Sequence, residues 1–313
     1  MLYIFLLICI CKVGKWGEAL NFRLTGKNMN TKFKGKTWEI VFLFAAAFSI
    51  LAVLLICLFL FANGIPAMHK IGWLDFLFGK TWKPGNEQFG IFPMIVGSLY
   101  VTAGAIIFGV PIGLMTAIFL SKFCSKKLKK YLKIAIDLLA GIPSVVYGFF
   151  GLMVIVPFVR NAFGGNGSSI LTASILLGIM ILPTIISVSE TALDSVPQSY
   201  YEGARALGET HELSVFRTVV PAAKSGIMAG IILGIGRAIG ETMAVIMVAG
   251  NQARLPDSIL KGVRTLTANI VIEMGYATDL HREALIATGV VLFVFILLIN
   301  LLFNLIKKRG VGV

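Results

Sequence analysis

Residues 226–249, GIMAGIILGIGRAIGETMAVIMVA, form an apolar stretch that contains two charged side chains, Arg237 and Glu241. A helix needs about 20 consecutive apolar residues to cross a hydrocarbon core of about 30 Å. This stretch is long enough, and its apolar residues form a continuous block rather than an alternating pattern. It therefore predicts a membrane-spanning helix that carries two opposite charges at bilayer depth.

Similar apolar blocks occur along most of the chain. Of its 313 residues, 57% are hydrophobic and 14% are charged, whereas a soluble domain carries about 25% charged residues. The polar residues are too few to cover a globular surface in water. We therefore expect an all-α, polytopic membrane protein with six transmembrane helices. The predicted spans are 39–61, 92–120, 134–158, 170–189, 226–249 and 284–306.

The net charge is +13, and the basic residues that produce it flank the apolar blocks. No basic stripe and no interleaving of basic and aromatic residues occurs, so we expect no nucleic-acid binding. Most of the 28 Lys and Arg residues lie before residue 39, at 122–133, at 205–224 and after residue 306. Cytoplasmic loops carry this kind of excess. Both termini are therefore predicted to be cytoplasmic, which agrees with an even number of spans.

The amino-terminal 38 residues (1–38) are predicted to be a basic cytoplasmic tail. The apolar run 2–10 is too short to span a bilayer, and it lacks the preceding basic residues of a signal peptide. Met29 opens MNTKFKGK, an ordinary basic lead-in to the first span. We expect residues 1–28 to come from an upstream start-codon assignment and to have little functional role.

Arg237 and Glu241 are four residues apart, so on one continuous helix they would share a face with Gly230 and Gly234. A charge at the bilayer centre costs at least about 2.5–3.5 kcal/mol, and such residues face a bundle interior or a watery path. A structural ion pair is one interpretation. A base that precedes an acid is the weaker order for helix support, and an isolated pair costs free energy to bury. We therefore favour a role in a solute path.

The chemistry of the two side chains indicates a class of solute. The planar guanidinium of Arg237 matches a tetrahedral oxyanion. The carboxylate of Glu241 repels a fully ionised anion but accepts a proton from one that keeps an O–H group. Phosphate keeps a proton near neutral pH and sulfate does not, so the pair suits phosphate better than sulfate.

The stretch 194–221, DSVPQSYYEGARALGETHELSVFRTVVP, is amphipathic and too polar to span. It predicts a short helix over 194–208, a turn at Gly208 and a second helix over 212–219. Such an elbow would project from the membrane toward a partner, and an ordinary loop is the alternative.

This elbow resembles the coupling signature of ABC-importer permeases, EAA–x3–G–x9–I–x–L–P. The spacing is kept, although Gly203 stands in place of the usual Ala and weakens the helix, while Thr218 and Val220 replace the Ile and Leu. The resemblance implies that the elbow docks into a groove of an ATPase subunit. The coupling residues that it implies are Glu202, Gly203, Ala204, Gly208 and Pro221.

A wider resemblance covers roughly residues 30–309. The segments GIPSVVYGFFGL (141–152) and GIGRAIGETMAV (234–245) are similar to the phosphate-specific permeases of this family. It implies the type I ABC importer permease fold, with a first transmembrane helix at 39–61 and a five-helix permease core at 90–306. It also implies that Arg237 and Glu241 line the transport path, in a bacterial or archaeal cytoplasmic (inner) membrane.

The same resemblance implies the partners. They are a second related permease subunit in a heterodimer, an ATPase dimer, an extracytoplasmic phosphate-binding protein, phosphate and the lipid bilayer. No GxxxxGK[ST] motif occurs, so we expect a chain that is not an enzyme and a separate subunit that hydrolyses ATP. No cofactor is expected. No metal site is expected either, because the CxC pair of Cys9 and Cys11 has no second ligand pair.

Two competing functions remain. The same machinery could import another oxyanion, such as molybdate or sulfate. Alternatively, the chain could be an ATP-independent channel or carrier with Arg237 and Glu241 as a gate or proton relay. The coupling elbow argues against the second, because a carrier does not need that motif.

Overall fold

The computed structural model of the chain describes residues 29–310. The expectation about residues 1–28, and the CxC pair within them, lies outside this part. The chain divides after Phe61 into two units, Met1–Phe61 and Ala62–Val313, and each is considered by itself.

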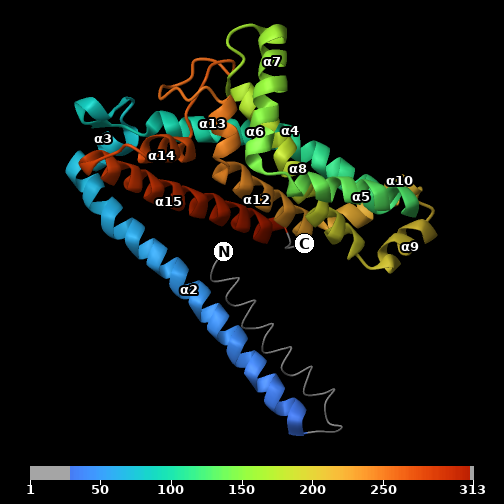
Figure 1. Cartoon of the computed structure of the whole chain (residues 1–313). Coiled ribbons are helices and arrows are strands. Elements are labelled where there is room, and N and C mark those ends of the chain that lie inside the picture. Colours follow the sequence, from blue (N-terminus) through green and yellow to red (C-terminus); the bar gives the residue numbers. More distant parts are fainter. Residues whose placement is uncertain (1–28, 311–313) are drawn as a thin grey trace. The chain divides into compact units, whose positions relative to one another are not determined.

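The described part of the first unit belongs to helix α2, Met29–Ile71, which continues into the second unit (Figure 1). The segment that is apolar enough to span begins at Trp38 and runs to Ile71, so the helix does not end at residue 61 as predicted. Phe44 and Phe48 are among many exposed large apolar side chains on it. Exposure of this kind fits a surface bathed by lipid rather than water.

Two long helices form the centre of the second unit. Helix α4, Phe92–Ile118, continues through a wider helical turn, η2, Phe119–Phe123, and packs along α8, Ile170–Asp194. A Cβ at Gly109 would lie 2.7 Å from Cδ1 of Ile181, and a Cβ at Gly104 would lie 2.2 Å from Oγ of Ser174. Glycine is required there because close backbone approach, not hydrophobic exclusion, holds helices together in lipid.

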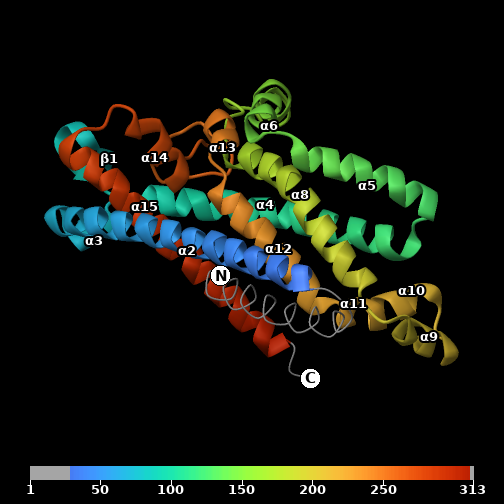
Figure 2. The same ribbon diagram turned by 60° about the horizontal axis from the view of Figure 1, so that its bottom comes forward.

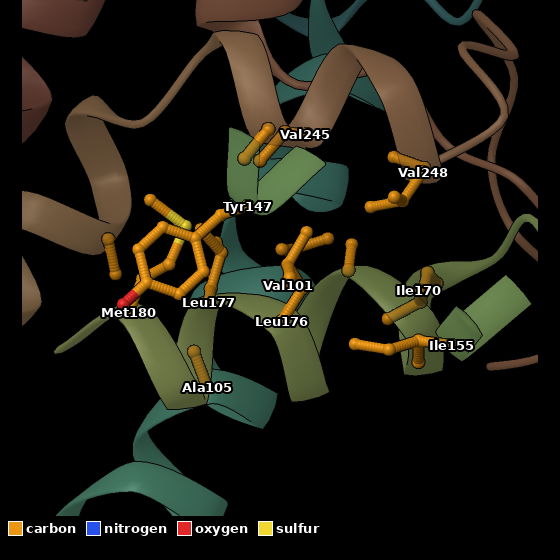
Figure 3. Packing of buried hydrophobic residues seen from close by; sticks show 14 of the residues in the cluster. Val101, Ala105, Tyr147, Ile155, Ile170, Leu176, Leu177, Met180, Val245 and Val248 are labelled. Atoms are coloured by element: carbon orange, nitrogen blue, oxygen red, sulfur yellow. The ribbon is translucent and has the colours of Figure 1, made fainter. Parts of the chain in front are cut away.

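The apolar core lies where these two helices meet three short ones (Figure 3). The short helices are α6, Ser144–Phe150, its continuation through η3, Gly151–Ile155, and α13, Met243–Val248. Leu176 and Leu177 of α8 are fully buried between them. The Tyr147 hydroxyl donates to the carbonyl of Leu139 at 2.9 Å, so the polar end of this core side chain is satisfied.

The third span is shifted from the predicted 134–158. Helix α5, Lys126–Gly141, ends before Pro143, which lacks an amide hydrogen and breaks the helical ladder. The helix that is apolar enough to span runs from Ser144 to Phe163 and includes α7, Val156–Phe163. Helix α5 is instead amphipathic, and none of its residues is buried.

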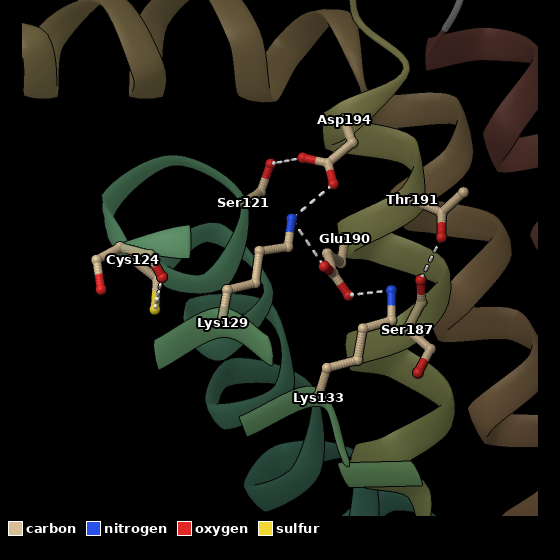
Figure 4. A network of polar contacts seen from close by, with 9 residues as sticks. Ser121, Cys124, Lys129, Lys133, Ser187, Glu190, Thr191 and Asp194 are labelled. Atoms are coloured by element: carbon tan, nitrogen blue, oxygen red, sulfur yellow. Dashed lines mark hydrogen bonds and ion pairs between the residues drawn. The ribbon is translucent and has the colours of Figure 1, made fainter. Parts of the chain in front are cut away.

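The fourth helix extends beyond the predicted end at residue 189, to Asp194. Its last turn carries Glu190, which is only 2% exposed. Figure 4 shows why the helix can continue: Lys129 and Lys133 of α5 lie 2.9 and 3.4 Å from the Glu190 carboxylate, and Lys129 also pairs with Asp194 at 2.8 Å. Pairing offsets the cost of burying the charge.

Burial alone would lower the pKa of the Lys129 ammonium. Hydrogen bonds and charge interactions with Asp194 and Glu190 outweigh burial, so the pKa lies above its usual value of 10.5.

The remaining elements lie at the two ends of the second unit. At one end are α3, Trp73–Phe78, a hairpin of β1, Trp82–Lys83, and β2, Gln88–Phe89, joined by η1, Pro84–Asn86, and the short helix α14, Leu266–Met274. At the other end are α9, Gln198–Ala206, α10, His211–Ser214, η4, Val215–Val219, and α11, Val220–Ala222 (Figures 1 and 2). The long helices connect these two ends.

The last two spans are α12, Lys224–Gly240, and α15, Asp279–Gly310. The described residues contain five helices that are long and apolar enough to cross a membrane, and a sixth if the bent pair His211–Ala222 and Lys224–Gly240 forms one span. The predicted all-α, six-helix class is therefore confirmed. The sixth helix begins five residues before the predicted start at 284 because Asp279 to Glu283 are already helical.

Candidate functional site

The helix that carries Arg237 is broken before Glu241. Helix α12 ends at Gly240, Glu241 has an extended backbone (φ −70°, ψ 131°), and α13 begins at Met243. The prediction that the two charges share one face of a continuous helix is therefore wrong. Glycine favours such a break because it weakens a helix interior.

The Glu241 side chain supports the next helix. Its Oε1 accepts hydrogen bonds from the amides of Thr242 at 3.1 Å and Ala244 at 3.3 Å. The first amides of a helix have no partner within the helix, so this carboxylate satisfies donors of α13. Its backbone carbonyl accepts from Oγ1 of Thr267 in α14 at 3.2 Å.

Arg237 has a different partner. Its Nη1 donates to Oγ1 of Thr184 on α8 at 3.4 Å. Over the described residues, no ion pair within 4.0 Å joins Arg237 to Glu241 or to any other carboxylate. The structural ion pair that the sequence left open is thus not formed here, and the guanidinium keeps most of its donors for a ligand.

Helix α12 has a packed face and an open face. A Cβ at Gly234 would lie 2.9 Å from Cγ1 of Ile185, so Gly234 belongs to the contact with α8. A Cβ at Gly236 or Gly240 would meet nothing within 4 Å, and Leu233 on the same side is exposed. Arg237 is partly exposed. The guanidinium therefore lies beside a backbone surface that a solute or a second subunit can approach closely.

The stretch 194–221 forms an elbow of short helices rather than an ordinary loop. Its first helix, α9, begins at Gln198 rather than at residue 194, because Asp194 is still part of α8 and Pro197 precedes the new helix. The chain reverses at Gly208, whose φ of +88° is a conformation that favours glycine. Thr210 then caps α10 by accepting from the amide of Leu213 at 3.4 Å. A 70° bend separates the end of the elbow at Ala222 from α12.

The residues predicted to couple to an ATPase fall into two groups in this elbow. Glu202 and Gly203 are exposed on α9, and a Cβ at Gly203 would meet nothing within 4 Å. Ala204 is buried against the rest of the unit. Gly208 makes the turn and Pro221 lies within α11, so these two residues shape the elbow rather than form its outer surface.

Two further residues of the elbow escaped the sequence reasoning. Leu207 is 89% exposed at the tip, immediately before the turn. The signal for it was available, because it is an apolar residue next to a turn glycine in a polar stretch.

His211 is the second residue, and it connects the elbow to the end of α4. Its Nε2–H donates to the carbonyl of Lys122 at 3.2 Å, which leaves Nδ1 to accept from the Tyr201 hydroxyl at 2.9 Å. The ring also packs edge-on against Phe123, with centroids 4.8 Å apart. A cavity of about 230 Å³ adjoins this contact. Only the fold brings these partners together, since Lys122 is far away in sequence.

Taken together, the spanning helices, the helix break beside a guanidinium that has no carboxylate partner among the described residues, and the elbow of short helices indicate a membrane transport component. Over residues 109–310 the sequence matches the family described as "Binding-protein-dependent transport system inner membrane component". The chain belongs to this family, and it is a multi-pass inner-membrane transport component rather than an enzyme.

Two relatives are similar in sequence to this chain over most of its length. The chain is 38% identical to the "Probable ABC transporter permease protein YqgH" of Bacillus subtilis, over 93% of this chain and 96% of that protein. It is 37% identical to the "Phosphate transport system permease protein PstC" of Mesorhizobium japonicum, over 82% of this chain and 84% of that protein.

Solved structures show the same fold at lower identity. A bacterial alginate ABC transporter, in complex with a pentasaccharide-bound periplasmic protein, has a chain that is 18% identical with a TM-score of 0.60. The match covers 90% of this chain and 98% of that chain. The predicted type I ABC importer permease fold is thereby confirmed.

Proposed function

We propose that this chain is one of two permease subunits of an ATP-driven importer that carries inorganic phosphate across the cytoplasmic membrane. The observation that carries the proposal is Arg237, a guanidinium within a membrane-spanning helix that has no carboxylate partner among the described residues. A charge within a membrane-spanning helix is costly and marks a solute path. The names of several relatives, such as the Mesorhizobium japonicum protein, supply the substrate.

Arg237 and Glu241 would act on the same oxyanion in different ways. The guanidinium would bind two phosphate oxygens through paired N–H donors. Only Oε1 of Glu241 makes a hydrogen bond among the described contacts, which leaves Oε2 to accept a proton from a P–OH group. Sulfate lacks that proton near neutral pH and would meet a repelling carboxylate. This division of roles favours phosphate over sulfate.

The break at Glu241 gives the path a place to bend. Transporters bind their solutes near the middle of the membrane at helices that are interrupted there. Because α12 and α13 are separate, α12 can move without pulling α13 out of the core (Figure 3). We infer that movement of α12 makes Arg237 accessible alternately from the two sides of the membrane.

The elbow would couple this motion to an ATPase. Gly203 leaves the outward surface of α9 flat, and the exposed Leu207 would enter a groove of the ATPase beside Glu202. Gly208 and Pro221 set the direction of the two arms, and Ala204 packs α9 onto the permease. A push on the elbow would then reach Arg237 through the bend into α12.

The complete importer would contain a second related permease, an ATPase dimer and an extracytoplasmic phosphate-binding protein. In this arrangement the 1–38 tail and the carboxyl terminus are cytoplasmic, and residues 90–306 form the permease core after the first transmembrane helix. The outer segments between the spans, which hold α3, the β1–β2 hairpin and α14, would meet the binding protein. The second permease would cover the open glycine surface of α12.

The test is uptake of labelled phosphate into vesicles that hold the complete complex, with ATP inside and the binding protein outside. Wild type should take up phosphate only with ATP, and excess sulfate or molybdate should not compete. Arg237→Lys keeps the charge but loses the bidentate fork, so uptake should fall at least about tenfold, as expected for a lost charge-assisted hydrogen bond of about 1.5–3 kcal/mol. Thr184→Ser keeps the hydroxyl partner and serves as the matched control.

Each other outcome points to a specific alternative. Competition by molybdate or sulfate would favour an importer of another oxyanion. Uptake without ATP would favour a channel or carrier. Normal uptake by Arg237→Lys would contradict bidentate binding at this residue.

A further inference from the structure

A buried carboxylate joins three separate segments at the end of the second unit that holds α3 and α14. Glu273 in α14 is only 5% exposed, yet three side chains donate to it. Nε1 of Trp82 donates to Oε2 at 2.7 Å, and Nε2 of His281 donates to the same oxygen at 2.8 Å. The guanidinium of Arg264 pairs with Oε1. We call these four residues the Glu273 clasp.

Each donor belongs to a different segment at this end of the second unit. Trp82 belongs to the β1–β2 hairpin, Arg264 precedes α14, and His281 lies in the first turns of α15. Burying a carboxylate has a large cost, and a well-packed apolar cluster would often be as stable. Hydrogen bonds are directional and apolar contacts are not. The three hydrogen bonds to one carboxylate therefore fix the orientation of the three segments relative to α14.

The β1–β2 hairpin has a buried base and an exposed tip. The indole of Trp82 packs edge-on against Phe89 at 5.6 Å and against the His281 ring at 6.1 Å. The turn that joins the strands, with Gly85, Asn86 and Glu87, is exposed. The tip is therefore open to a partner, while its base is connected to α14 through the Trp82 hydrogen bond.

The other side of the clasp leads to the transport path. Oγ1 of Thr267, six residues before Glu273 on the same short helix, donates to the carbonyl of Glu241. The amide of Leu266 donates to Oγ of Ser98 on α4 at 3.0 Å. Helix α14 has only nine residues, so a shift at Glu273 is carried as a rigid unit to Glu241 and α4.

We propose that Glu273 is a positioning residue that links docking of the binding protein on the exposed hairpin to the helix break at Glu241. The link rests on the proposed function, since it needs a binding protein that docks outside. Docking moves the hairpin, the Trp82–Glu273 hydrogen bond moves α14, and Thr267 transmits the shift to the break between α12 and α13. Without the clasp, the binding protein still docks but its arrival no longer changes the path.

The experiment measures ATP hydrolysis by the purified complete complex in lipid, with and without phosphate-loaded binding protein. Trp82→Phe removes the N–H donor and part of the indole ring but keeps an aromatic ring, and Glu273 remains paired with Arg264 and His281. The ratio of stimulated to basal hydrolysis should fall about fivefold or more, the lower end of usual coupling between two sites. Basal hydrolysis should change little, whereas the melting temperature should fall, because a buried carboxylate loses one donor and a buried ring becomes smaller.

Three further variants separate coupling from stability. Trp82→Phe combined with Glu273→Gln should lose no more stimulation than Glu273→Gln alone, since both act through one hydrogen bond. Lys70→Gln breaks an exposed ion pair with Glu283 near the same end of α15 and should leave the ratio unchanged.

An unchanged ratio in Trp82→Phe would overturn the proposal, and so would a lower melting temperature with the ratio intact, which would show a purely structural role. Wild type without ATP-driven phosphate uptake would instead contradict the proposed function, and with it the link. The two failures are distinguished by the wild-type control.

Discussion

At the scale of single residues, one backbone break changes the chemistry of two charges. On a continuous helix, Arg237 and Glu241 could neutralise each other across one turn. The break after Gly240 instead gives Glu241 the amides of Thr242 and Ala244 as partners. Arg237 is left with a single hydroxyl partner, Thr184. A guanidinium without a fixed counter-ion is what an anion path needs.

Leu207 carries the prediction at this scale. Leu207→Asp should abolish ATP-driven uptake, because a charge at the tip of the elbow cannot enter an apolar groove without a large desolvation cost. The substitution is on the surface, so the free energy of unfolding should change by no more than about 0.5 kcal/mol. Uptake by vesicles and the melting temperature of the purified permease measure the two effects, and recovery of the ATPase with the permease measures docking directly.

Leu207→Met is the matched control and should retain most of the uptake, since it keeps an apolar side chain of similar volume. Wild-type uptake by Leu207→Asp would show that the tip does not contact the ATPase.

At the scale of elements, α5 and α8 are held together by ion pairs in addition to the apolar packing of Leu132 and Ile136. Lys129 bridges Glu190 and Asp194, and Oγ of Ser121 donates to Asp194 at 2.6 Å (Figure 4). Because Asp194 is the last residue of α8, this contact fixes where the elbow begins. The lysine-rich segment therefore does more than satisfy the charge rule for cytoplasmic loops.

Lys129→Met should destabilise the complex by about 1–3 kcal/mol, because the buried Glu190 loses a charged partner. The pKa of Lys129 is raised in the folded protein, so its contribution is fully present below its ordinary pKa of 10.5 and is lost as pH rises through the higher folded value. The difference in melting temperature between wild type and Lys129→Met should therefore persist below pH 10.5 and shrink above it.

Lys130→Met is the control, since Lys130 is exposed and makes no ion pair in the described part of the chain. An equal loss in Lys130→Met, or a difference that grows with pH, would contradict the role of Lys129.

At the scale of the whole molecule, the long helices of the second unit separate two groups of residues, one at each end. The Glu273 clasp and the hairpin lie at one end, and the elbow with Leu207 lies at the other (Figures 1 and 2). Between them, α12 and α14 both approach the break at Glu241. Signals from a binding protein and from an ATPase would therefore meet at the same point in the path.

This arrangement predicts opposite accessibility for the two ends. In a cysteine-free background, Leu207→Cys should react with a membrane-impermeant thiol reagent only from the cytoplasmic side. Asp257→Cys, at an exposed position in the outer loop, should react only from the outside. Labelling of intact cells and of inverted vesicles measures this, and both cysteines reacting from one side would contradict the proposed orientation.

The sequence by itself determined the class of the protein. Apolar blocks of about 20 residues can only be helices in a bilayer, because every backbone polar group must be satisfied within the segment. The same local reasoning identified Gly208 as a turn, since it depends on one residue and its neighbours. The predicted bounds of the third and fourth spans are wrong: the chain breaks before Pro143 inside an apolar block, and α8 continues to Asp194 because its charges find partners far along the chain.

Only the tertiary structure decided how the charges are used. No local pattern indicates that Glu241 caps α13, that His211 reaches the carbonyl of Lys122, or that Trp82 donates to Glu273. The contacts of His211 and Trp82 join segments that are distant in sequence, and the contact of Glu241 needs the helix break after Gly240; the strength of all three depends on burial and direction, which arise only when the helices pack. The sequence therefore determined that charges lie within the membrane protein, and packing decided which partner each one has.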